Sequence, residues 1–198
     1  MLNSIEKLAF LLAKLPGMGS RSAKRAVLHL LKYQDQLMLP LADELKKTAQ
    51  NIKTCSICAN LDEISPCQIC IDAKRNHQLI CIVETVSDLW AIERARIFNG
   101  TYHVLQASIS SSARRMPEEL NLATLNSRIL TDQVTEVIIA TNATLEGQTT
   151  CFYITDILNK DFPNLKITRL ASGIPIGGEL DYLDDSTLEA AMISRKTL

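Results

Sequence analysis

The sequence predicts a protein of the α/β class, in which a parallel sheet follows a helical N-terminal module and a small cysteine-rich module. Three observations predict this. Short apolar runs alternate with helical stretches after residue 79, two Cys-x-x-Cys pairs fall within residues 54–78, and residues 1–53 have helical periodicity. The 198 residues are 46% hydrophobic and 22% charged, which excludes a collagen-like, coiled-coil or disordered chain.

The charge is divided unevenly along the chain. Residues 1–53 hold nine Lys and Arg against four Asp and Glu, whereas residues 81–198 hold ten against fifteen. This division favours a contact between the N-terminal end and a polyanion, although such differences often serve only solvation. No apolar run reaches the ~18 residues of a membrane span and the first ten residues do not resemble a secretory leader, so we expect a cytoplasmic protein without membrane contact.

Residues 5–32 have the pattern of two helices joined by a tight turn. Apolar side chains recur at helical spacing over 5–15, and Pro16 ends this first helix. A second helix is expected over Arg21–Lys32, with Ser20 as its N-cap. Glycines that permit unusual backbone angles punctuate the turn between the helices. That turn reads Leu15-Pro16-Gly17-Met18-Gly19.

A helix-hairpin-helix of this kind suits the phosphate backbone of DNA. Glycines let the hairpin backbone approach a phosphate, and the first amides of the second helix can donate hydrogen bonds to it regardless of base sequence. The alternative is an ordinary helical hairpin with a solvated basic face. The residues expected to contact DNA are Gly17, Gly19, Arg21, Lys24 and Arg25.

Four cysteines have the spacing of a structural zinc site. Each Cys-x-x-Cys pair offers two sulfurs to one ion, so two pairs complete a tetrahedron and leave no position for a substrate. We expect one Zn²⁺ per chain, which would stabilise a loop too short for a hydrophobic core; the alternative is a set of free or redox-active thiols. The expected ligands are Cys55, Cys58, Cys67 and Cys70, while Cys81 and Cys151 lie in apolar runs and are expected to be buried.

The rest of the chain predicts a parallel sheet with crossover helices. After a polar helix over 40–52, strands are expected over Leu79–Val83, Tyr102–Leu105, Val137–Ala140 and Ile167–Leu170. Helices are expected over Ser87–Arg96, Glu118–Leu130, Gln148–Lys160 and Ser186–Ile193.

Ligands of such sheets bind where the strands end. Glu84 follows the first strand, and Asn142, Glu146 and Gly147 follow the third. The two carboxylates could bind Mg²⁺ if the strands are adjacent, or they could simply cap helices.

In these residues the chain resembles the RecR family of recombination-mediator proteins, over essentially its whole length. The resemblance rests on four motifs in the family's order. They are the hairpin Leu15–Gly19 with Arg21 and Arg25, the four cysteines, the Toprim-domain segments Cys81–Glu84 and Ala140–Gly147, and the segment Arg169–Tyr182.

The resemblance implies a helix-hairpin-helix module (1–53), a four-cysteine zinc finger (54–78), a Toprim domain (79–172) and a C-terminal segment for subunit contacts (173–198). It implies a ring-like dimer or tetramer that binds gapped DNA and its single-strand/double-strand junctions, and that acts with RecO and RecF to load RecA. It also implies that Glu84, Asn142 and Glu146 contact RecO rather than perform catalysis.

The alternative function is a Mg²⁺-dependent Toprim nuclease or strand-transfer enzyme. Catalytic Toprim domains add an Asp-x-Asp pair, and the corresponding place here reads Asn142-Ala143-Thr144. Fewer carboxylates weaken Mg²⁺ binding, so we expect neither catalysis nor resident Mg²⁺. No Walker A sequence is present either, so ATP hydrolysis is not expected.

The chain also departs from the family pattern. Residues 106–117 lack the family's glycines, and Arg114-Arg115 add positive charge there. Ala143 and Gln148 stand where relatives have proline and glutamate, so one acid is lost from the expected partner surface.

Overall fold

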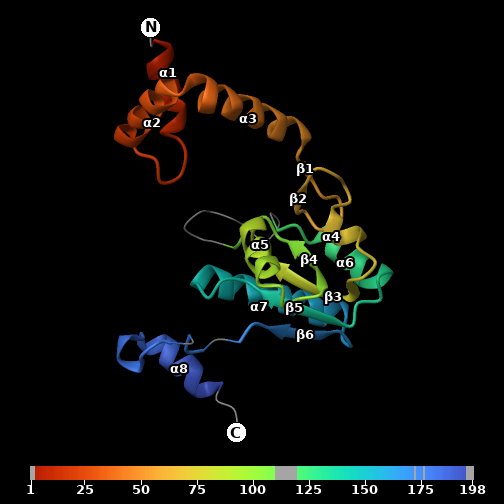
Figure 1. Cartoon of the computed structure of the whole chain (residues 1–198). Helices are drawn as coiled ribbons and strands as arrows, with labels where there is room; N and C mark the ends of the chain where they lie inside the picture. Colours follow the sequence, from red (N-terminus) through yellow and green to blue (C-terminus); the bar gives the residue numbers. More distant parts are fainter. Residues whose placement is uncertain (1–2, 110–119, 172, 176, 195–198) are drawn as a thin grey trace. The chain divides into compact units, whose positions relative to one another are not determined.

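A computed structural model describes residues 3–109, 120–171, 173–175 and 177–194 (Figure 1). The chain divides into two compact units, Met1–Ile52 and Lys53–Leu198, which are described separately below. Arg114-Arg115 and most of the glycine-poor segment 106–117 lie outside the described residues. Among the residues that are described, no helix has the length and hydropathy needed to cross a membrane.

The N-terminal unit is helical, as predicted. Its elements are α1 (Ser4–Leu12), α2 (Ser20–Lys32), the π-helical turn η1 (Gln34–Met38) and α3 (Leu39–Asn51). An Asn3–Glu6 capping box starts α1, and α1 packs against α2 around the buried Ala9, Ala23 and Val27.

Two predicted boundaries in this unit were wrong. The first helix ends at Leu12 rather than residue 15, because the chain enters a turn three residues before Pro16. Ser20 is the first residue of α2 and not its N-cap, which is Gly19. The basic helix therefore begins directly after the second glycine of the hairpin.

The cysteine module opens the second unit. Strands β1 (Lys53–Thr54) and β2 (Leu61–Asp62) pair antiparallel, and the single-turn helix α4 (Gln68–Ile71) follows. The four cysteines are buried in a cluster of their own, against which Ile57 and Ile69 pack. Such a small module contains almost no apolar core, as the sequence predicted.

The main sheet is parallel, with strand order β4-β3-β5-β6. The strands are β3 (Asn76–Val83), β4 (Gly100–Val104), β5 (Glu136–Ala140) and β6 (Lys166–Arg169). All four predicted strands are present within a few residues of their expected bounds. The largest difference is in β3, which begins three residues early because its first half is only partly buried and does not read as an apolar run.

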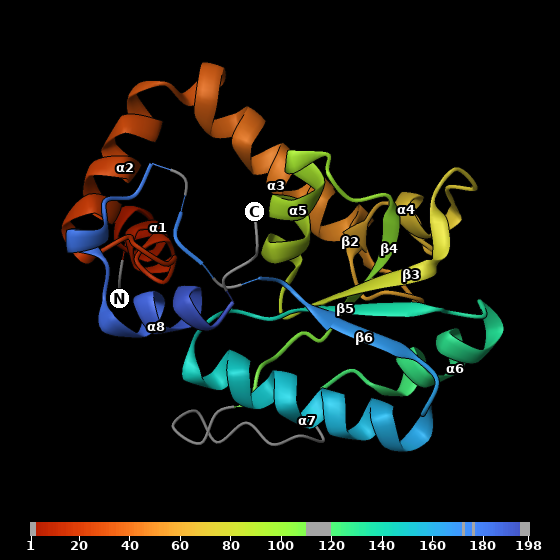
Figure 2. The ribbon, with the colours of Figure 1, turned by 90° about the horizontal axis from the view of Figure 1, so that it is seen from below.

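Helices cover both faces of the sheet, with α5 (Val86–Ala95) on one and α6 (Ala123–Thr131) and α7 (Leu145–Asp161) on the other (Figure 2). Successive residues of β3 point to opposite faces of the sheet. Ile80 and Ile82 pack in the core beneath α6 and α7, while Cys81 and Val83 pack in the core beneath α5. The burial of Cys81 and of Cys151 on α7 confirms their prediction as small core residues.

Two crossover helices begin elsewhere than expected. Helix α6 starts at Ala123 rather than 118, and the first residues of the expected helix lie outside the described part of the chain. Helix α7 starts at Leu145 rather than Gln148, because the Thr144 hydroxyl caps it by accepting a hydrogen bond from the Gly147 amide.

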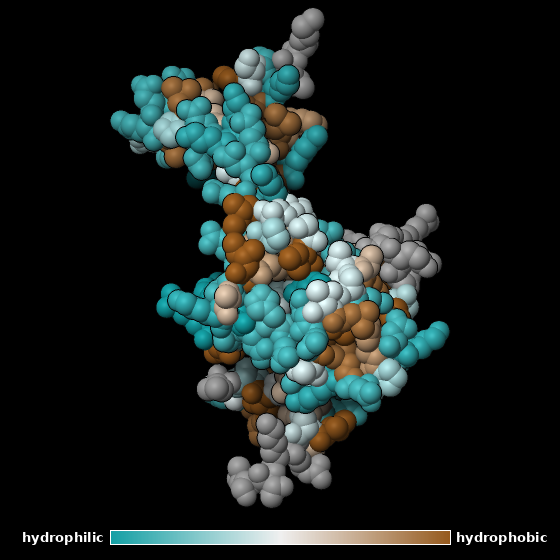
Figure 3. Space-filling model, turned by 90° about the vertical axis from the view of Figure 1, so that its right-hand side faces the viewer, coloured by the Kyte–Doolittle hydropathy of each residue, from teal (hydrophilic) through white to brown (hydrophobic). Residues whose placement is uncertain are grey.

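The C-terminal segment contains the 3-10 turn η3 (Leu180–Tyr182) and helix α8 (Asp185–Ile193), with Asp184 as N-cap. Exposed apolar side chains occur in both units. On the face shown in Figure 3 they form separate patches within a largely hydrophilic surface.

Candidate functional site

The hairpin leaves the N-terminus of α2 open. Gly17 has a φ of 76°, a left-handed conformation that suits glycine, and the Met18 amide closes the turn by donating to the Leu15 carbonyl at 3.1 Å. No side chain caps α2, and the space where a Cβ would stand on Gly17 or Gly19 is free of atoms within 4 Å. The first amides of α2 therefore have no side-chain acceptor, and a helix N-terminus of this kind attracts anions.

Arg21, Lys24 and Arg25 follow this N-terminus on one face of α2, and all three side chains are exposed. None of them forms an ion pair within the described parts of the chain, and no acidic residue lies in the first turn of the helix. The structure thus places all five predicted DNA-contact residues on one short segment.

Sequence reasoning missed Lys32, which continues this basic face. It is exposed, and it follows Arg21 by three helical turns. The spacing of 11 residues was visible in the sequence and would have predicted it.

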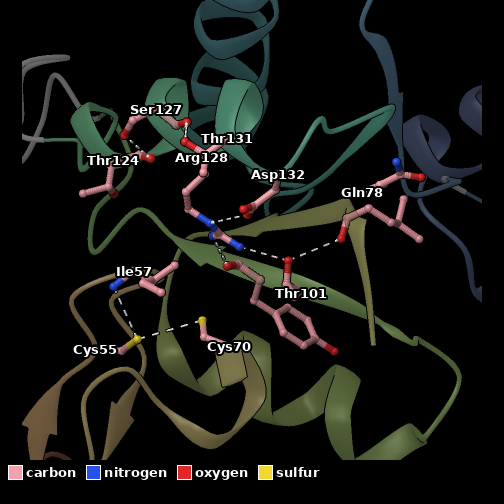
Figure 4. Close-up of polar contacts among 12 residues, drawn as sticks. Cys55, Ile57, Cys70, Gln78, Thr101, Thr124, Ser127, Arg128, Thr131 and Asp132 are labelled. Atoms are coloured by element: carbon pink, nitrogen blue, oxygen red, sulfur yellow. Dashed lines mark hydrogen bonds and ion pairs between the residues drawn. The ribbon is translucent and has the colours of Figure 1, made fainter. Parts of the chain in front are cut away.

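The four predicted metal-ligating cysteines come together. Their sulfurs all lie within 4.8 Å of one another, with Cys55 and Cys70 3.9 Å apart and Cys58 and Cys67 3.5 Å apart. Ligands at 2.3 Å from a tetrahedral Zn²⁺ would be about 3.8 Å apart, so the cluster fits a metal ion of this size. Figure 4 shows the Cys55–Cys70 contact and the Ile57 amide that donates to the Cys55 sulfur.

Hydrogen bonds from backbone amides and between the thiols favour the thiolate form of some of these cysteines. The amides of Ile57, Asn60 and Cys67 donate to cysteine sulfurs at 3.2 to 3.5 Å, which stabilises thiolates. Hydrogen bonding from the Cys58 thiol lowers the pKa of Cys67, and the same contact raises the pKa of Cys58 to about 12. Without a cation the four groups cannot all ionise, and a metal ion would displace the remaining protons.

The cysteine module is attached to the edge of the main sheet. The Val104 amide on β4 donates to the Cys58 carbonyl at 2.8 Å, and Ala59 packs into the α5 core. The first Cys-x-x-Cys pair is therefore held against the free edge of β4 by a backbone hydrogen bond and by the packing of Ala59.

Two arginines that sequence reasoning did not select hold the same strand. The Arg75 guanidinium donates to both Glu93 carboxylate oxygens, at 2.7 and 2.8 Å, and to the Gly100 carbonyl. Buried Arg128 donates to the Tyr102 carbonyl at 2.7 Å and to the Thr101 hydroxyl at 2.9 Å (Figure 4). The Arg75 guanidinium also lowers the pKa of Glu93. Both arginines stabilise the fold rather than form a ligand site.

The third predicted site lies at the carboxyl ends of β3 and β5, which are adjacent. Glu84 is buried at 6% exposure, and its two carboxylate oxygens accept from the Asn142 backbone amide at 2.9 Å and from Asn142 Nδ2 at 2.8 Å. Glu146 is half-buried in the first turn of α7, and no hydrogen bond or ion pair of its carboxylate is found among the described residues.

The structure therefore places the three residues predicted to contact a partner in different surroundings. Glu84 is directed into the protein, Asn142 lines a hollow together with Ala143, Gln148 and Arg169, and Glu146 is partly exposed. In the described part of the chain, only the four cysteines bring three or more metal-ligating side chains together.

Family models match three parts of the chain. Residues 5–49 match the RecR helix-hairpin-helix family, residues 78–171 the Toprim domain, and residues 173–196 the RecR C-terminal family. Among curated proteins, the chain is 49% identical over 191 residues to "Recombination protein RecR" of Bartonella bacilliformis, which is 96% of this chain and 94% of that protein.

Two other relatives carry the same name. The protein of Sinorhizobium fredii is 50% identical over 194 residues, covering 98% of this chain and 96% of its own. The protein of Beijerinckia indica is 52% identical over 191 residues, covering 96% and 94%.

Proposed function

The chain belongs to the RecR family of recombination proteins, which act in DNA repair, and on this premise we propose that it holds the DNA backbone through the α2 hairpin without reading base sequence. The observation that supports this most strongly is the N-terminus of α2, which no side chain caps. Gly17 and Gly19 precede it with free space at their Cβ positions. Arg21, Lys24 and Arg25 follow it, and none of them forms an ion pair among the described residues. Backbone amides and basic side chains contact phosphates, which are the same at every base pair.

Binding by phosphate contacts has a measurable signature. Each neutralised phosphate releases counterions, so the affinity falls steeply as salt rises and is similar for unrelated sequences. The proposed substrate is gapped DNA with its single-strand/double-strand junctions.

We assign the four-cysteine cluster to one structural Zn²⁺ per chain. All four sulfurs would be ligands, so the ion would keep no open position and would supply folding energy rather than chemistry. The ion and the amides that donate to the sulfurs would stabilise the module itself, and the hydrogen bond from the Val104 amide to the Cys58 carbonyl attaches it to β4.

The sheet edge is proposed as a protein contact rather than a catalytic centre. Residues 142–144 lack the Asp-x-Asp pair of catalytic Toprim domains, and Glu84 is already occupied by hydrogen bonds from Asn142. Glu146, with its free carboxylate in the described structure, is the residue we expect RecO to contact. Glu146→Ala should then weaken RecO binding and leave DNA binding intact.

In the cell we propose a cytoplasmic, nucleoid-associated protein that acts with RecO and RecF to load RecA onto gapped DNA. It would work as a homo-oligomeric ring, a dimer or a tetramer, with residues 173–198 in the subunit contacts. We propose that the helix-hairpin-helix module ends at residue 53, the zinc module at residue 78 and the Toprim domain at residue 172.

The test is to incubate the purified protein with Mg²⁺ and a labelled gapped duplex, with and without RecO, and to score both the complex and the integrity of the strands. Intact DNA in a complex that RecO strengthens supports the proposal. Cut or joined strands, lost again in Glu84→Ala, would show a Toprim enzyme instead.

A further inference from the structure

Glu84 is a buried carboxylate at the meeting point of β3, β5 and α7, and no Lys or Arg of the described residues pairs with it. A buried carboxylate requires compensation, because removing a charged group from water is strongly unfavourable. The compensation here comes from neutral groups. Among the described residues, both donors to this carboxylate belong to Asn142, one from the backbone and one from the side-chain amide.

The N-terminus of α7 adds to this compensation. An ideal Cβ on Gly147 would stand 2.7 Å from Glu84 Oε1 and 2.1 Å from the Asn142 carbonyl, so only glycine lets the first turn of the helix come this close. The positive end of the helix dipole therefore faces the carboxylate. Thr144 already caps the helix, which means that Glu84 is not needed as a cap.

We propose that the Asn142 amide takes the place of a cation beside Glu84, so that the Glu84–Asn142 pair positions loop 141–147 and closes this carboxylate to divalent metal ions. Each Glu84 oxygen accepts a directed N–H bond, and Asn142 offers donors, not ligand oxygens, on the side that faces the acid. An aspartate at 142 would present oxygens instead, and two facing carboxylates would then need a proton or a metal ion between them.

The pair can be tested by exchanging its donor and acceptor. In Glu84→Gln the new amide NH₂ faces the Asn142 amide, and in Asn142→Asp two carboxylates face each other. In the double variant Glu84→Gln/Asn142→Asp, the oxygen of the new glutamine can still accept from the backbone amide of residue 142. Its NH₂ group can donate to the new aspartate, so the side-chain hydrogen bond forms in the opposite direction, and the net charge of the protein is unchanged. Thermal unfolding of the full-length, metal-loaded protein would be recorded for all four proteins, with and without millimolar Mg²⁺ or Mn²⁺.

We expect each single variant to lower the unfolding midpoint by about 3 to 10 °C, and the double variant to recover most of that loss without added metal. Added Mg²⁺ or Mn²⁺ should raise the midpoint of Asn142→Asp and leave the wild type unchanged. If Asn142→Asp does not fold, Glu84→Gln and the double variant still decide the matter. A double variant no more stable than Glu84→Gln, or a wild type stabilised by Mg²⁺ through Glu84, would overturn the proposal.

This positioning role does not depend on DNA or on RecO. Binding of the four proteins to a gapped duplex should be equal at a temperature where all are folded, because the proposed DNA contacts lie on α2. Failure of the exchange would therefore leave the proposed DNA-binding function standing, and failure of the α2 variants would leave the Glu84–Asn142 pair standing.

Discussion

The helical N-terminal unit and the sheet of the second unit are stabilised in opposite ways. In the first, the buried apolar side chains of the described residues are the small ones of Ala9, Ala23 and Val27, while Phe10 and Leu28 are more than half exposed. In the second, two cores lie on the two faces of the sheet and include Tyr102, Leu125 and Ile154. Substitutions on α2 should therefore change DNA binding more than the free energy of unfolding. Substitutions in the sheet should change the free energy of unfolding more than DNA binding.

Loss of a metal ligand should have the largest effect on stability and should be confined to the second unit. Cys58→Ser removes one of four sulfurs from a module with almost no apolar core, so we expect loss of the bound metal and unfolding of residues 53–78. Metal content and hydrogen exchange of the full-length protein measure this. Cys151→Ser changes a buried cysteine outside the cluster and should keep one metal ion per chain. Full metal content in Cys58→Ser would contradict the assignment.

A matched pair of leucines tests the comparison directly. Leu158 on α7 is 1% exposed and Leu28 on α2 is 62% exposed. Leu158→Ala should lower the free energy of unfolding by about 2 to 5 kcal/mol, because it leaves a cavity in the core. Leu28→Ala should change it by about 0.5 kcal/mol or less. Denaturant titration measures both, and equal losses would mean that the N-terminal unit has a core comparable to that of the sheet.

Acid should destabilise the second unit through His103. Its Nε2–H donates to the Asn121 carbonyl, and burial lowers its pKa from 6.5 to about 4. The unfolded chain therefore binds the proton more readily, so the stability is complete above pH 6.5 and falls as the pH drops from 6.5 to 4. The loss should be on the order of 3 kcal/mol.

Denaturant titrations at several pH values measure this dependence. His103→Gln keeps a donor for the Asn121 carbonyl but cannot titrate, so its stability should be less sensitive to pH in that range. An identical pH profile for both proteins would assign the acid sensitivity to other groups.

Arg21→Ala/Arg25→Ala should have the smallest effect on stability, about 0.5 kcal/mol or less, and a clear effect on DNA affinity. Removing two phosphate contacts should weaken binding to all sequences alike and reduce the slope of log affinity against log salt by about 2. Lys46→Ala/Lys47→Ala on α3 removes the same charge from exposed positions of the same unit and is the control. If both double variants bind equally weakly, net charge rather than the hairpin determines the affinity.

Local patterns in the sequence predicted most of the fold, including the cysteine cluster and the helical hairpin. The four cysteines and the hairpin residues each lie within about 16 residues, so their spacing alone predicted that they meet. Strands were predicted because buried strands of a parallel sheet are continuous apolar runs. The start of α7 was missed because the cap at Thr144 sits among other polar residues.

Contacts between distant segments could not be predicted in the same way. Glu84 and Asn142 are 58 residues apart, and their pairing depends on β3 lying beside β5 with Val83 opposite Ala140. Arg128 reads as an ordinary surface charge on an amphipathic helix, and only the neighbouring β4 backbone explains its burial.

The bond between the Val104 amide and the Cys58 carbonyl has a consequence for solubility. Strand β4 is at one end of the sheet, and an uncovered end strand offers its backbone groups to other chains. The cysteine module shields this strand as long as it stays folded. Chelation of the proposed zinc ion should therefore lead to β-type aggregation of the second unit, beginning at the strand that the folded module had protected.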